Sequence, residues 1–90
     1  MTPRPDRLRI ETLLREALEA SEVAVTDDSH LHSGHAGARE GGHFSVRIVS
    51  VRFAGLARVA RHRLVYSALG PLMQRGIHAL AIDARTPEER

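Results

Sequence analysis

The stretch His43-Phe-Ser-Val-Arg-Ile-Val-Ser50 decides the fold, because apolar and polar side chains alternate along it. Successive side chains of a strand point to opposite faces of a sheet. Phe44, Val46 and Ile48 would therefore face one side, and the polar residues between them the other. Two further stretches also have the composition of strands. The sequence predicts three strands, over residues 22–26, 43–50 and 77–84.

Helical patterns surround these strands. Apolar residues recur at helical spacing in two long segments, and a Gly-Pro pair would end the second of them. The resulting order, α-β-β-α-(α)-β, predicts an α/β (α+β) domain with helices packed on one face of a three-stranded sheet. Residues 1–5 are expected to form a flexible tail and residues 6–90 a single domain. The helices are expected over residues 6–20, 56–69 and 71–75, with a further helix starting at 86.

Composition excludes several classes of protein. The 90 residues include no cysteine, so a disulfide framework, a thiolate nucleophile and a self-contained cysteine-ligated metal site are all excluded. No apolar run approaches the roughly 20 residues that cross a bilayer, and the N-terminus does not resemble a signal peptide. The cytoplasm is the expected location. All 13 basic residues are arginine, which explains a pI of about 10.4 at a net charge of only +2.

Three of the six histidines lie close together in a polar, glycine-rich segment between the first two predicted strands. His30, His32 and His35 have the spacing i, i+2 and i+5, which in a flexible loop can converge on one metal ion. Imidazole alone does not select among zinc, copper, nickel and iron. The alternative interpretation is that these histidines are ordinary polar surface residues.

His78 and an arginine-rich helix face are the other candidate sites. His78 begins an apolar strand, and on composition alone it is best interpreted as a core-edge histidine bonded to the backbone. The predicted helix 56–69 carries basic residues that could contact phosphates, although a solvated helix face is favoured at a net charge of +2. These residues are Arg58, Arg61, His62 and Arg63.

Signs of catalysis are lacking. Neither a phosphate-binding loop nor a dinucleotide-binding fingerprint is present, and no spacing identifies a catalytic triad or a carboxylate pair. We therefore expect neither enzymatic activity nor a small-molecule substrate.

Five short motifs follow one another between Asp27 and Pro87, over about two-thirds of the chain. They are Asp27-Asp-Ser-His30, the strand His43–Ser50, Phe53-Ala-Gly55, Arg61-His-Arg-Leu-Val-Tyr66, and His78-Ala-Leu-Ala-Ile82 with Ala84-Arg-Thr-Pro87. Each motif is weak alone, but with all five in this order the segment resembles the BolA family.

This resemblance implies a class II KH-like topology and a non-enzymatic partner of monothiol glutaredoxins. In such pairs a [2Fe–2S] cluster is shared, and the glutaredoxin contributes a cysteine thiolate and holds glutathione, which contributes another. The BolA-like protein contributes the histidine that matches His78 and a second ligand from the loop between the first two strands. The resemblance thus reverses the structural interpretation of His78.

The second ligand is one of the loop histidines. Counting from Ser29 favours His32, whereas counting back from His43 comes within one residue of His35, so neither count decides. We rank His35 first, because the glycines beside it let the backbone bend, with His32 second and His30 third.

DNA is the alternative partner, because some BolA relatives are described as transcription regulators. The matching surface would lie between Phe53 and Tyr66. Its phosphate contacts would be Arg58, Arg61, His62 and Arg63.

Overall fold

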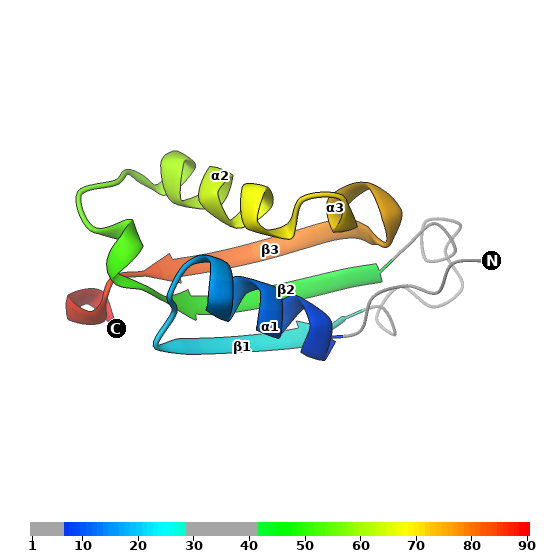
Figure 1. Cartoon of the computed structure of the whole chain (residues 1–90), viewed down its shortest axis with the longest axis horizontal. Coiled ribbons are helices and arrows are strands. Elements are labelled where there is room, and N and C mark those ends of the chain that lie inside the picture. Colours follow the sequence, from blue (N-terminus) through cyan, green and yellow to red (C-terminus); the bar gives the residue numbers. More distant parts are fainter. Residues whose placement is uncertain (1–6, 29–41) are drawn as a thin grey trace.

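The computed structural model describes residues 7–28 and 42–90 (Figure 1). At His78 it describes the backbone but not the side chain. The predicted order of helices and strands is confirmed. No described helix is long and apolar enough to span a membrane. The elements are α1 (Arg7–Ala17), β1 (Glu22–Asp27), β2 (Gly42–Val49), η3 (Val51–Phe53), α2 (Arg58–Leu69), α3 (Leu72–Arg75), β3 (Ile77–Arg85) and η4 (Pro87–Glu89).

Two helices are shorter than the sequence predicted. Helix α1 ends at Ala17 because Glu19 adopts a left-handed conformation, with φ of 50°. This conformation terminates many helices. Helix α2 begins at Arg58, after Gly55 has turned the chain with φ of 77°. The predicted tail 1–5 and residue 6, where the first helix was expected to begin, lie outside the described residues.

The sheet has the order β1-β2-β3. Strand β1 runs antiparallel to β2, with Glu22 opposite Val49 and Asp27 opposite Phe44. Strand β3 runs parallel to β2, and α2 and α3 form the crossover that a parallel pair requires. Consequently β1 ends, and β2 and β3 begin, at the same end of the sheet (Figure 1).

One face of the sheet packs against the helices, as predicted. The alternating residues of β2 that were expected to share a face are buried, and they join apolar side chains of α1 and α2 in one cluster. On the other face, Ala24, Arg47 and Ala81 are exposed. The buried members of the cluster are Ile10, Leu14, Leu18, Ala20, Val25, Phe44, Val46, Ile48, Phe53, Val65, Leu69 and Ile77.

Ser50 is a fully buried polar residue that joins three parts of this fold. Its hydroxyl donates to the Leu18 carbonyl at 2.5 Å and accepts from the Arg52 N–H at 3.0 Å, while its own N–H donates to the Arg85 carbonyl at 2.9 Å. The hydroxyl therefore links the end of α1 to the start of η3, at the point where β2 and β3 finish.

Replacing Ser50 with alanine should lower the free energy of unfolding by about 1–3 kcal/mol, because a buried carbonyl and a backbone N–H lose their partner. Urea denaturation measures this loss. Ser67→Ala, at an exposed position of α2, is the matched control and should change stability by no more than about 0.5 kcal/mol. Equal effects of the two changes would contradict a structural role for the Ser50 hydroxyl.

Candidate functional site

The first candidate site is the end of the sheet where β2 and β3 begin. Backbone hydrogen bonds fix the two residues that bound the segment 29–41. The Asp28 N–H donates to the His43 carbonyl at 2.7 Å, and the Gly42 N–H donates to the Gly76 carbonyl at 2.7 Å. Gly76 lies two residues before His78, so the second bond holds Gly42 next to the start of β3. The Asp28 end of the histidine-rich segment is held against β2, at the same end of the sheet.

An irregularity in the sheet singles out His78. Gly42 is opposite Ile77, but the next residue, His43, is opposite Ala79. Strand β3 therefore has one extra residue at this point, and that residue is His78. Such bulges redirect the strand and are common beside functional sites.

The structure does not describe the side chain of any predicted ligand. His30, His32 and His35 lie outside the described residues, and so does the side chain of His78. Within the described ranges, no three histidine, aspartate or glutamate side chains are grouped so as to hold a metal ion. A metal centre at this end would therefore need donors from residues 29–41, from His78 or from another molecule.

A hollow of about 270 Å³ lies at the same end, beside the start of β3. The Ser45 hydroxyl donates to the Asp28 carboxylate at the edge of this hollow. This hydrogen bond connects the end of β1 to β2. Sequence reasoning treated Asp28 only as part of a motif. The signal that could have found it is its position, directly after a strand and directly before the histidine-rich segment. The hollow is lined by Asp28, His43, Phe44, Ala79, Leu80 and Ala81.

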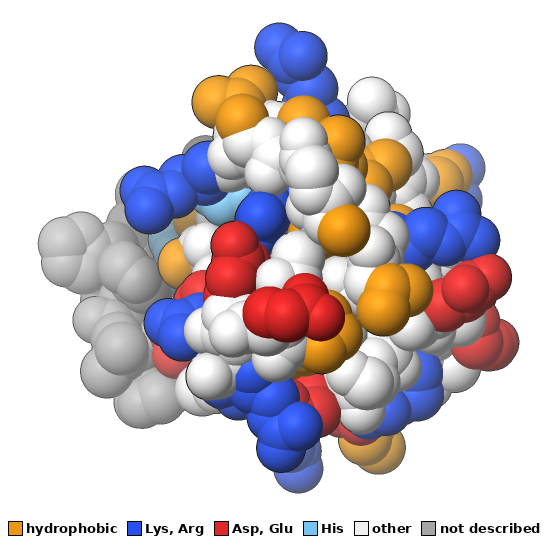
Figure 2. Space-filling model, turned by 90° about the vertical axis from the view of Figure 1, so that its left-hand side faces the viewer, with side chains coloured by type: hydrophobic (Ala, Val, Ile, Leu, Met, Phe, Trp, Pro, Cys, Tyr) orange, Lys and Arg blue, Asp and Glu red, His pale blue; other side chains and the backbone are white. Residues whose placement is uncertain are grey.

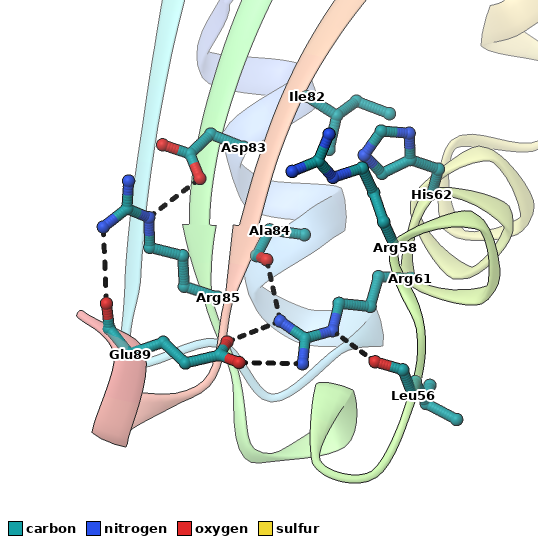
Figure 3. A pocket seen from close by; sticks show the side chains of 9 residues that line it. All are labelled: Leu56, Arg58, Arg61, His62, Ile82, Asp83, Ala84, Arg85 and Glu89. Carbon is teal, nitrogen blue, oxygen red and sulfur yellow. Dashed lines mark hydrogen bonds and ion pairs between the residues drawn. The ribbon is translucent and has the colours of Figure 1, made fainter.

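The second candidate site is a groove of about 560 Å³ between the start of α2 and the final residues of β3 (Figure 3). Three of the four predicted phosphate contacts line it, and Arg63 does not. Its lining residues are Leu56, Arg58, Arg61, His62, Ile82, Asp83, Ala84, Arg85 and Glu89.

Arg61 is committed to contacts within the chain. Its guanidinium donates to the Leu56 carbonyl at 2.8 Å, to the Ala84 carbonyl at 3.1 Å and to both carboxylate oxygens of Glu89 (Figure 3). The side chain of Arg61 is only 14% exposed. It therefore joins the start of α2 to the end of β3 and to η4, and few of its N–H groups remain for a ligand.

Glu89 is the electrostatic partner in this contact. The ion pair with Arg61 and a hydrogen bond from the Thr86 N–H, at 2.8 Å, lower the pKa of Glu89 to about 2. The pKa of Arg61 is raised by the same hydrogen bond to Glu89. Both groups are thus charged across the whole physiological range.

Of the remaining charged side chains of the groove, Asp83 and Arg85 form an ion pair and Arg58 does not take part in one within the described residues. Asp83 accepts from Arg85 at 2.9 Å, which is the main reason why the pKa of Asp83 is lowered. Arg58 lies near His62 and makes no hydrogen bond or ion pair within the described residues. Around this end of the molecule, basic and acidic side chains are interspersed (Figure 2). The surface is therefore not a continuous positive face.

Comparison with known proteins decides the family. Residues 14–89 match the model of the family described as BolA-like protein. The chain belongs to the BolA family. This BolA-like protein is 43% identical over 83 residues to a Sinorhizobium protein described as "Uncharacterized protein in cobS 5'region", with 89% of each chain covered. It is also 41% identical to human BolA-like protein 1, covering 94% of this chain and 61% of the relative.

Solved BolA structures agree with this fold. The BolA domain of SufE1 from Arabidopsis thaliana is 44% identical, with a TM-score of 0.81, and the alignment covers 92% of this chain and 93% of that domain. BolA1 from the same plant is 38% identical, with a TM-score of 0.78 and the same coverage. The full-length relatives are longer: the chain spans 53% of chloroplastic BOLA1 and 24% of SufE-like protein 1.

Proposed function

We propose that this BolA-like protein is a non-enzymatic adaptor that binds a monothiol glutaredoxin and shares a [2Fe–2S] cluster with it. One observation carries the proposal: the segment that bears His30, His32 and His35 begins and ends at the end of the sheet where the bulge at His78 lies. It ends at Gly42, next to the start of β3, and it begins after Asp28, which is bonded to His43 of the central strand. A ligand from this segment and His78 could therefore reach one cluster.

The available donors fit half of such a site. The chain has no cysteine, so its own contribution is imidazole, and the thiolates would come from the glutaredoxin and its glutathione. His78 would be the first ligand, and His35, or else His32, the second. Replacing thiolate with neutral imidazole reduces the negative charge of the cluster and raises its potential, as in Rieske centres. The cluster would supply iron and sulfide for assembly or trafficking, or a redox signal.

The experiment is to mix the purified protein with a cluster-loaded monothiol glutaredoxin and to record visible absorption and circular dichroism. Wild-type protein should change both spectra, because two thiolate ligands are replaced by imidazole. His78→Ala should abolish the change. His62→Ala is the matched control, because His62 lies on α2 beside the groove at the other end of β3.

Single changes in the loop identify the second ligand. His35→Ala should weaken the spectral change most, His32→Ala less, and His30→Ala least. Spectra identical to those of the glutaredoxin alone, or an unaltered response in His78→Ala, would reject the proposed function.

A further inference from the structure

Strand β3 lies at an edge of the sheet, and its residues 82–85 line the groove described above. Successive residues of a strand direct their peptide groups to opposite edges. The Arg85 carbonyl accepts from Ser50, which follows β2, whereas the Ala84 carbonyl accepts from Arg61 of α2. By this alternation, the peptide groups of Leu80 and Ile82 share the outward direction of Ala84.

The outward peptide groups of Leu80 and Ile82 have no hydrogen-bond partner within the described part of the chain. No hydrogen bond there joins the N–H or carbonyl of Leu80 or Ile82 to a residue outside the sheet. An unpaired row of peptide groups at a sheet edge is a template for another extended chain. The Arg61 contact with the Ala84 carbonyl shows that a donor reaches this row from the α2 side.

The charge of the groove selects the kind of chain that would bind. Arg61 is neutralised by Glu89, and Arg85 by Asp83. Arg58 is exposed and makes no hydrogen bond or ion pair with the described residues, although its charge acts on the nearby Asp83. It lies beside His62 close to Ile82 (Figure 3). Three arginines and two carboxylates line the groove, so its net formal charge is +1.

We propose that the groove between α2 and the edge of β3 binds an extended acidic peptide segment of another protein. The segment adds as a strand beside Leu80 and Ile82, and one of its carboxylates pairs with Arg58. A peptide fits this groove better than a nucleic acid, because the wall offers main-chain donors and acceptors.

The groove and the hollow at the start of β3 have different linings, but the added strand would reach the hollow at Leu80. Leu80 lies roughly 7 Å and Ile82 roughly 13 Å along the strand from His78, at about 3.3 Å per residue. The inference rests on the edge of β3 and not on the proposed function.

The test uses an acetylated and amidated peptide of alternating glutamate and valine, titrated into the isotopically labelled protein. The backbone N–H signals of Leu80 and Ile82 should shift, because they gain hydrogen bonds. Arg58→Gln should raise the dissociation constant about 2- to 5-fold, as expected for one partly exposed ion pair. Arg63→Gln removes the same charge from the same helix but outside the groove, and should leave the dissociation constant unchanged.

Two N-methylated peptides separate strand addition from simple charge attraction. One peptide carries methyl groups on its odd-numbered backbone nitrogens and the other on its even-numbered ones. Because alternate N–H groups of a strand point to opposite edges, one of the two peptides loses every donor directed at β3. One of the two should fail to bind, and the other should bind like the parent peptide. Equal binding of both, equal weakening by the two arginine changes, or no binding of the parent peptide would overturn the proposal. A DNA oligonucleotide that shifts the same signals at lower concentration would assign the groove to nucleic acid instead.

Discussion

Replacing Phe53 with alanine is expected to lower the free energy of unfolding by about 3–5 kcal/mol, the usual cost of deleting a buried aromatic ring. Phe53 is fully buried, and it belongs to the single apolar cluster between the helices and the sheet. A domain of 90 residues has a total stability of only about 5–13 kcal/mol. The change should therefore leave a large unfolded fraction at moderate urea concentration.

Phe53→Leu is the control for this experiment. Leucine fills most of the space of the ring, so the loss should be clearly smaller than for alanine. Chemical denaturation followed by far-UV circular dichroism gives both values. Similar midpoints for wild type and Phe53→Ala would mean that the ring is not part of the core.

Removing the Arg61 guanidinium should destabilise the protein more than any other exchange of a single arginine. Arg61→Ala leaves the carbonyls of Leu56 and Ala84 without their donor and Glu89 without its partner. Arg63→Ala removes an exposed arginine from the same helix and should have little effect. If thermal melting temperatures fall equally in the two variants, the contacts of Arg61 contribute nothing beyond its charge.

The acid dependence of stability gives a second readout of this ion pair. The pKa of Glu89 is lowered from 4.5 in the unfolded chain to about 2 in the fold. Its contribution to stability is therefore complete above about pH 4.5 and is lost as the pH falls toward 2. Glu89→Gln should be less stable than wild type at pH 7, and the difference should disappear near pH 2. A difference that is constant with pH would exclude the carboxylate as its cause.

Much of the fold could be predicted from residue patterns. The alternation from Phe44 to Ile48 specifies β2 and its buried face, and the structure confirms both. The boundaries were less predictable, because the end of α1 depends on the backbone conformation of Glu19, and glutamate carries no signal for it.

The sites were predictable to different extents. The family resemblance marked His78, and the bulge at that residue is consistent with a special role, although the ligand assignment stays a prediction. Arg61 was predicted as a phosphate contact because it lies among other basic residues. Its actual contacts are with Leu56, Ala84 and Glu89, and the last two of these lie more than twenty residues away in sequence. Helical spacing describes one helix at a time, so it could not reveal them.

The placement of both proposed sites on the single strand β3 has a consequence for avidity. A partner that presents an acidic tail as well as a cluster-binding surface would engage both ends of β3 at once. The first contact would then raise the effective concentration of the second, and two weak interactions would yield one tight complex. The gain depends on a linker that spans the roughly 7 to 23 Å along β3 between His78 and residues 80–85. A partner whose tail is shorter than this would bind at one end only, so the length of β3 would itself select among partners.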